Sequence, residues 1–202
     1  MKFVEEKILK EGHVIGEDIL KVDSFVNHRI DSKFVFDICK EFAKEFKDMG
    51  INKVVTIETS GIVYGIVTAY ELGNLPLVFA KKSKSKTVDE NNVYKTEIKS
   101  FTRNTVSEVT IDKRFLDKND NVLIVDDFLA EGNAALGLID LCEQAGATVT
   151  GFATVIDKAF QGGRKIVIDK WSISALPRQF LSTSRSMSST VSARYSSATQ
   201  AR

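Results

Sequence analysis

Apolar side chains follow two different spacings along the chain. Residues 32–49 carry large apolar side chains three or four positions apart and end at Gly50, which predicts a helix. Similar spacing predicts helices over residues 4–9, 62–72 and 133–145. Short apolar runs of the kind that form buried strands lie at residues 53–58, 75–80, 122–125 and 148–156.

The order of these elements predicts the fold class. Two β-α-β units flank residues 95–103 and 106–115, which alternate like a hairpin with Asn104 in its turn. We therefore expect an α/β fold with a mainly parallel twisted sheet, helices on both faces and one projecting β-hairpin. Residues 1–170 are expected to form a single domain of this kind.

Charge and cysteine content limit the partners and the cellular compartment that we expect for this protein. The 202 residues have a formal net charge of +1, which predicts no strong general attraction to nucleic acid or to a membrane surface. The first residues mix charges with single apolar side chains, unlike a signal peptide, and no apolar run is long enough for a spanning helix. Cys39 and Cys142 both fall on predicted helices. We expect buried free thiols and a cytoplasmic protein.

The last part of the chain has a different composition. From Trp171 to Arg202 there is no Asp, Glu or Lys, whereas there are four arginines and ten serines. No helical or strand period persists through this segment. Residues 171–202 are therefore expected to be a disordered tail or the product of a shifted reading frame.

The segment from Asn121 to Ala134 carries the clearest chemistry. Four apolar residues run directly into Asp126 and Asp127, and a short stretch containing Gly132 then opens a helix. Ligands of open α/β sheets bind beyond the carboxyl ends of strands, and a helix N-terminus there attracts phosphate. The adjacent carboxylates can accept hydrogen bonds from hydroxyls or bind a metal. This combination suits a sugar phosphate.

Two other interpretations of the acidic pair remain open. The carboxylates could cap the following helix. The run VLIVDD also resembles the first strand of receiver domains, although too little chain follows for the rest of that fold. The glycine patterns typical of nucleoside triphosphate and dinucleotide sites do not occur.

The whole pattern resembles the 5-phosphoribosyl-1-diphosphate signature of the type I purine phosphoribosyltransferases. Five further segments follow the order seen in the bacterial branch of that family that uses xanthine: residues 20–31, 55–61, 78–82, 99–102 and 155–160. The resemblance covers about residues 1–169. It implies transfer of ribose 5-phosphate from 5-phosphoribosyl-1-diphosphate to xanthine, which releases diphosphate.

The resemblance also implies roles for individual residues at the sugar end. Asp126 and Asp127 would be catalytic, facing the ribose hydroxyls and favouring positive charge at C1′. The 5-phosphate would be wrapped by Ala130, Glu131, Gly132, Asn133 and Ala134. The diphosphate would meet Ser60, Gly61 and Lys82, with Lys81 as the next choice. Without the resemblance, Thr59 or Ser60 is an ordinary helix cap, and the four lysines at 81–86 form a solvated loop or a weak nucleic-acid patch.

At the base end, the resemblance implies that Leu20 and Asn27 cover the xanthine ring and that Lys158 donates to the 6-oxo group. Asn27 could read the second oxo group, which hypoxanthine lacks. Phe160 could stack on the base or lie in the core, and Lys158 could be a surface lysine. Residues 100–103 fall in the mobile hairpin of the family, which excludes water from the site.

The remaining expectations concern the metal ion, the general base, the oligomeric state and the alternative functions. Mg²⁺ would travel with the diphosphate, and no protein metal site is expected, since His13 and His28 lack ligand spacing. Some family members place an acidic base at the position of Ala130, so no general base is assigned here. A homodimer is the family expectation. The alternatives are a regulator that binds the diphosphate sugar without catalysis and an inactive chain.

Overall fold

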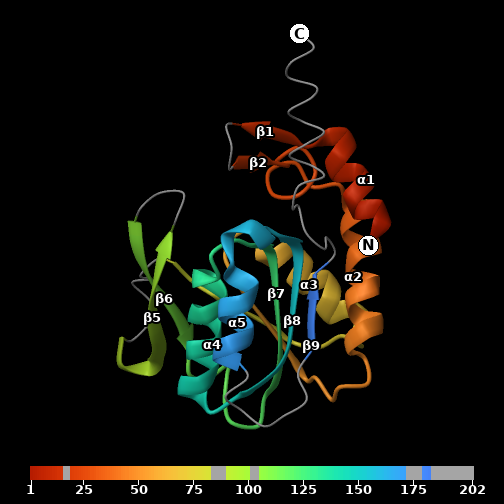
Figure 1. The fold of residues 1–202 in the computed structure, drawn as a ribbon. Coiled ribbons are helices and arrows are strands. Elements are labelled where there is room, and N and C mark those ends of the chain that lie inside the picture. The colour runs from red at the N-terminus through yellow and green to blue at the C-terminus, as the bar shows by residue number, and fades with distance from the viewer. Residues whose placement is uncertain (16–18, 83–89, 101–104, 172–178, 183–202) are drawn as a thin grey trace.

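The computed structural model describes residues 1–15, 19–82, 90–100, 105–171 and 179–182 (Figure 1). The helices are α1 (Lys2–Glu11), α2 (Ser32–Phe46), α3 (Gly61–Glu71), α4 (Asn133–Ala145) and α5 (Gly163–Trp171), with short 3₁₀ turns η1 (Glu90–Asn92) and η2 (Ala159–Gln161). The strands are β1 (His13–Ile15), β2 (Ile19–Lys21), β3 (Lys53–Ile57), β4 (Leu77–Ala80), β5 (Val93–Ser100), β6 (Thr105–Asp112), β7 (Asn121–Leu129), β8 (Thr148–Asp157) and β9 (Gln179–Ser182).

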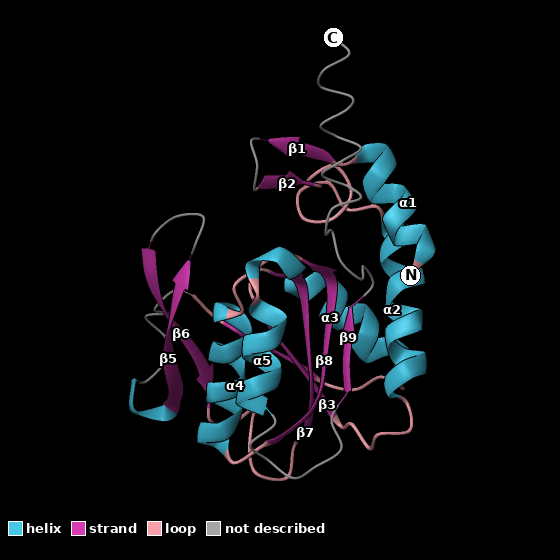
Figure 2. Cartoon of the chain, viewed as in Figure 1, coloured by secondary structure: helices cyan, strands magenta, loops and turns pink. Residues whose placement is uncertain are grey.

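A parallel sheet forms the centre of the molecule. Its described strands lie in the order β4-β3-β7-β8-β9, and each neighbouring pair is parallel. Helices α2 and α3 lie on one side of this sheet and α4 and α5 on the other (Figure 2). The predicted α/β class, a mainly parallel sheet flanked by helices, is confirmed.

Alternate residues of the central strands serve two separate cores. Leu123 and Val125 of β7 pack in the cluster that includes α1, α2 and α3. Val122 and Ile124 pack in the opposite cluster, with α4 and the β5–β6 hairpin. Successive side chains of a strand point to opposite faces, so a continuous apolar run is what burial on both faces requires.

The hairpin is antiparallel, as expected, and stands out from the sheet (Figure 1). It is tied to α4 along its length. The Gln144 side chain bonds the backbone of Lys95 twice, at 2.9 and 3.2 Å, and a Cβ at Gly137 would lie 2.5 Å from Ile98. The predicted turn residue, Asn104, lies outside the described residues.

The spacing of apolar residues does not predict every element of the structure. β1 and β2 are three-residue strands that pair as a small antiparallel ribbon, too short for a period to register. β9 lies inside the Ser/Arg-rich tail and pairs with β8, so that five tail residues, these four and Trp171 at the end of α5, take regular structure. The other tail residues, 172–178 and 183–202, lie outside the described residues. None of the described helices has the length and apolar character needed to cross a bilayer.

Candidate active site

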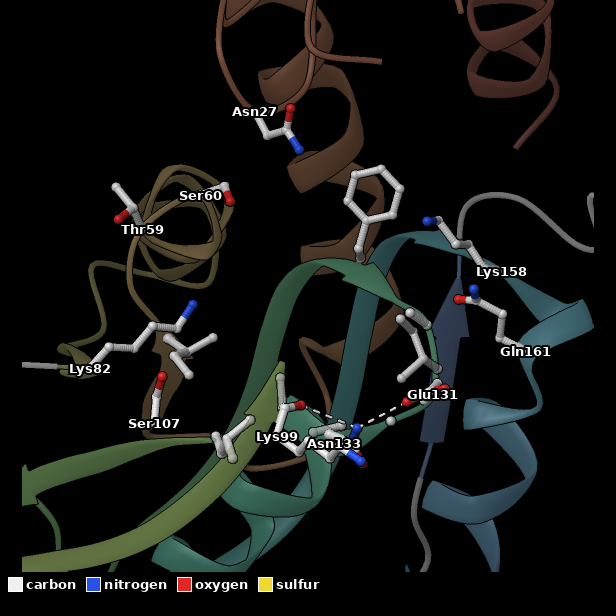
Figure 3. Close-up of a pocket in the computed structure, with 18 of the residues that line it drawn as sticks. Asn27, Thr59, Ser60, Lys82, Lys99, Ser107, Glu131, Asn133, Lys158 and Gln161 are labelled. Atoms are coloured by element: carbon white, nitrogen blue, oxygen red, sulfur yellow. Dashed lines mark hydrogen bonds between the residues drawn. The ribbon is translucent and has the colours of Figure 1, made fainter. Parts of the chain in front are cut away.

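A cavity of about 590 Å³ lies beyond the carboxyl ends of β3, β7 and β8, where open α/β sheets bind ligands (Figure 3). Its walls come from the loops after these strands, from the hairpin and from the segment before α2. The lining residues are Asn27, Ile57, Thr59, Ser60, Lys82, Ile98, Lys99, Thr105, Ser107, Phe128, Leu129, Ala130, Glu131, Gly132, Asn133, Ala134, Ala135, Lys158 and Gln161.

The loop Ala130–Ala134 forms one end of the cavity and opens α4. Gly132 occupies the N-cap position with φ of 88°, a left-handed conformation that strongly favours glycine. No side chain caps the helix, so the acidic pair does not serve as its cap. A 13-residue helix that begins at a cavity presents backbone N–H groups and a positive dipole end there, which suits an anion.

Asp126 and Asp127 lie inside β7, because this strand continues to Leu129 and does not end at residue 125 as the sequence pattern predicted. Their side chains are 5% and 8% exposed. Burial raises the pKa of the Asp126 carboxyl well above its ordinary value, and the neighbouring Asp127 raises that pKa further. The Asp127 amide donates to Asp126 Oδ1 at 2.9 Å. A Cβ at Gly61 would lie 2.9 Å from the same oxygen, so the acidic pair adjoins the loop before α3.

The loop Glu58–Gly61 forms a second end of the cavity. Its Glu58–Thr59 peptide bond is cis. Ser60 is at the N-cap of α3, but its side chain makes no capping hydrogen bond, so Ser60 is not the ordinary helix cap that was the alternative interpretation. The Glu58 carboxylate accepts a hydrogen bond from the Lys82 backbone amide, which joins this loop to the end of β4. Lys82 and Ser60 thereby line the same part of the cavity (Figure 3).

The loop after β8 forms the third wall. The Lys158 ammonium lies 5.3 Å from the centroid of the Phe128 ring, a cation–π distance. The Lys158 amide donates to the Leu129 carbonyl at 2.8 Å, and the Gly163 amide donates to Ala130 at 3.1 Å. These bonds join the third wall to the Ala130–Ala134 loop.

Behind Lys158, Asp157 is 1% exposed and lies 3.6 Å from Arg164 of α5. Burial raises the pKa of the Asp157 carboxyl, whereas Arg164 opposes that rise.

Comparisons with known proteins identify the family. The profile of the phosphoribosyl transferase domain matches residues 30–179. A xanthine phosphoribosyltransferase of Bacillus cereus (strain B4264) is 51% identical over 167 residues, which cover 82% of this chain and 84% of that protein. Its counterpart in Bacillus mycoides (strain KBAB4) is 50% identical over the same length. The chain belongs to the phosphoribosyltransferase family.

Solved structures of this family share the fold. The adenine phosphoribosyltransferase of Saccharomyces cerevisiae has a TM-score of 0.67 at 22% identity and covers 90% of this chain and 99% of its own. The enzyme of Giardia lamblia has a TM-score of 0.70 at 24% identity, covering 88% and 94%. The strand, loop and helix order around the cavity is therefore that of a phosphoribosyltransferase.

The structure brings most of the residues expected in a phosphoribosyltransferase site to one cavity. Those that line it are Asn27, Ser60, Lys82, Ala130, Glu131, Gly132, Asn133, Ala134 and Lys158. Asp126, Asp127 and Gly61 are buried and are not part of the lining. Leu20 is 7% exposed in β2 and is not part of the lining, so its contact with a base stays a prediction.

The aromatic residue that lines the cavity is Phe128 and not Phe160. Phe160 is 50% exposed and does not line the cavity, so neither of its expected roles, base stacking or core packing, has support in its position. Phe128, which the sequence reasoning missed, lines the cavity instead. The signal was present, because Phe128 directly follows the acidic pair at the end of a strand that points at the site.

Other lining residues were missed as well. Ser107 and Thr105 reach the cavity from the hairpin, and Gln161 from η2. The Gln161 Oε1 atom is buried and has no hydrogen-bond partner among the described residues. Most of the predicted lysine loop at 81–86 and of the mobile hairpin segment at 100–103 lies outside the described part of the chain, which lacks residues 83–89 and 101–104.

Proposed function

We propose that this protein is a purine salvage enzyme that transfers ribose 5-phosphate from 5-phosphoribosyl-1-diphosphate to xanthine. The products are xanthosine 5′-phosphate and diphosphate. The observation that carries the proposal is the match to xanthine phosphoribosyltransferases at 51% identity over 82% of the chain. The cavity geometry supports it, because the Ala130–Ala134 loop, Lys82 and Lys158 line one space, and the buried Asp126 carboxylate lies beside Gly61 at the start of α3.

The Ala130–Ala134 loop would bind the 5-phosphate. Its small side chains leave the backbone amides at the start of α4 accessible to phosphate oxygens. Asn133 Nδ2 donates to the Lys99 carbonyl and to Glu131 Oε2, both at 3.2 Å, and holds the loop against the hairpin (Figure 3). The phosphate would therefore anchor the sugar at a fixed distance from the other walls.

Asp126 and Asp127 would act on the ribose. As the bond between C1′ and the diphosphate oxygen breaks, positive charge grows on the ring, and nearby negative charge stabilises it. The electron pair of that bond leaves with the diphosphate, and xanthine N9 then bonds to C1′. The acidic pair would also accept hydrogen bonds from the 2′- and 3′-hydroxyls.

The leaving group would occupy the space between Ser60, Gly61 and Lys82. Mg²⁺ is expected to accompany the diphosphate, since its hard oxygen ligands would come mainly from the substrate and water. The buried carboxylates beside Gly61 are hard oxygen groups of the kind that fit such an ion, directly or through water. Among the described residues, no cluster of three or more His, Cys, Asp or Glu side chains is arranged to hold a metal alone.

The base would lie against the wall formed by Lys158, with Asn27 facing it across the cavity (Figure 3). Lys158 would donate to the 6-oxo group and Asn27 would read the 2-oxo group, while Phe128 offers an aromatic face for stacking. Ala130 leaves the loop without the acidic residue that serves some relatives as a base. The proton lost from xanthine is therefore not assigned to a side chain of that loop.

A homodimer is part of the proposal. Helix α3 and the edge strand β4 expose Ile66, Tyr70 and Phe79, which are 52%, 63% and 37% exposed. Ile66 and Tyr70 lie one turn apart on α3, and exposed apolar groups that lie together are typical of surfaces that pair with another chain.

A steady-state assay tests the function. Purified protein with Mg²⁺ and 5-phosphoribosyl-1-diphosphate is offered xanthine, guanine, hypoxanthine or adenine in turn, and we expect the highest kcat/KM with xanthine. Asp127→Asn should lower kcat by about 100-fold, the scale for losing one group that stabilises transition-state charge. Binding of the sugar without turnover of any base would favour the non-catalytic alternative.

A further inference from the structure

Asn27 reaches the cavity from a separate part of the chain. It lies in the segment between β2 and α2, whereas the other described residues that line the cavity are at or after Ile57. A side chain on a separate segment has a defined position next to a ligand only if that segment is held in place relative to the sheet.

Residues 22–31, which we call the Asn27 loop, form a compact unit. The Val26 amide donates to the Val22 carbonyl at 3.0 Å, and the Arg29 amide donates to Asp23 at 2.8 Å. Val22, Phe25 and Val26 are at most 2% exposed. Internal hydrogen bonds and buried side chains therefore hold the backbone of this loop together.

A buried hydroxyl joins this unit to α3. Tyr64 is fully buried, and its Oη donates to the Val26 carbonyl at 3.2 Å. Tyr64 lies one turn into the helix whose preceding residues, Thr59 and Ser60, line another wall of the cavity. One helix therefore carries both the expected diphosphate loop and the donor that holds the residue next to Asn27.

We propose that Tyr64 is the positioning residue that fixes Asn27 over the base and so sets selectivity for xanthine. The inference rests on the proposed function. Removal of the hydroxyl leaves the buried Val26 carbonyl without this donor, and the Asn27 loop shifts to satisfy it. The 2-oxo group with which Asn27 would bond is present in xanthine and absent in hypoxanthine. The shift of the loop therefore weakens the binding of xanthine more than the binding of hypoxanthine.

The test is Tyr64→Phe, which keeps the ring and removes one oxygen. The measured quantity is the ratio of kcat/KM for xanthine to that for hypoxanthine, which does not depend on how much of a preparation is folded. We expect the ratio to fall about 3- to 10-fold, the range for one net hydrogen bond, through the KM for xanthine. The KM for 5-phosphoribosyl-1-diphosphate should stay within about twofold of the wild-type value.

Two controls separate positioning from general damage. Thr68→Val removes a hydroxyl from an equally buried residue one turn further along α3, and it should leave the ratio unchanged. In an Asn27→Ala background, Tyr64→Phe should have no further effect on the ratio, since the two residues act as one unit.

An unchanged ratio in Tyr64→Phe, or additive effects with Asn27→Ala, would overturn the inference. A wild-type protein that does not turn over xanthine would instead overturn the proposed function.

Discussion

The backbone amide of Gly163 donates to the carbonyl of Ala130 at 3.1 Å, which joins the loop that carries Lys158 to the loop expected to bind the 5-phosphate. A Cβ at Gly163 would lie 2.6 Å from the Gly132 amide nitrogen and closer still to the Ala130 oxygen. Backbone on both sides of this contact cannot yield as a flexible side chain would. The two ends of the site are therefore held in register by direct backbone contact.

Gly163→Ala should separate these loops. We expect the KM for 5-phosphoribosyl-1-diphosphate to rise by about 10-fold or more, as misplacement by about an ångström can do far from the chemistry. Gly162→Ala is the matched control. It introduces strain at a φ of 76° but meets no atom within 4 Å, so it should lower thermal stability and leave this KM nearly unchanged. Equal KM values in both variants would contradict the account.

The raised pKa of Asp126 predicts a pH-dependent stability cost. A carboxyl whose pKa is higher in the folded state holds its proton more tightly there, so stability falls as pH rises above the ordinary pKa. Asp126→Asn removes this cost and should therefore stabilise the protein at pH 8. The gain in stability should be smaller at pH 5 than at pH 8. Transfer activity should fall at both pH values.

Thermal unfolding of the wild type and of Asp126→Asn at the two pH values measures this effect. A variant that is less stable than wild type at pH 8 would show that the ionised carboxylate stabilises the fold instead.

The two phenylalanines near Lys158 form a natural pair of variants. Phe128 lines the cavity and lies beneath the Lys158 ammonium, whereas Phe160 is half-exposed outside the lining. Phe128→Ala should raise the KM for the base by about 5- to 10-fold through lost stacking, on the scale of 1–1.5 kcal/mol. Phe160→Ala should change it less than twofold. The reverse order would return the stacking role to Phe160.

The two cysteines should be inert in the folded protein. Both are buried and free, as the sequence predicted, and burial raises the pKa of each thiol to about 12. The reactive thiolate is therefore scarce near neutral pH. Titration with a thiol reagent at pH 8 should detect no fast-reacting thiol in the native state and two after denaturation. A fast native reaction would contradict their burial.

Local signals were sufficient to predict much of the fold. Helix α4 begins and ends where the sequence indicates, because Gly132 and Gly146 both adopt left-handed backbone at its ends. β9 was not predictable in the same way, since its pairing with β8 depends on a distant strand and the tail composition conceals it. Three-residue strands such as β1 likewise depend on a partner that local pattern does not specify.

The site residues that directly follow a strand were predictable from the sequence. Residues at strand ends, such as Lys82 and Lys158, share an edge of the sheet because parallel strands end together. Ser107 and Gln161 were not predictable, because they reach the cavity through packing of the hairpin and of η2. Position after a strand also does not decide which aromatic side chain faces the ligand, so the sequence does not single out Phe128 as a lining residue.

The central claim is transfer of ribose 5-phosphate to xanthine, and product stoichiometry tests it most directly. Protein, Mg²⁺, 5-phosphoribosyl-1-diphosphate and xanthine are incubated, and xanthosine 5′-phosphate and diphosphate are quantified by mass spectrometry and a coupled assay. The account predicts equal amounts of both products, and little diphosphate when xanthine is omitted. Diphosphate release at the same rate without xanthine, or no xanthosine 5′-phosphate at all, would contradict it.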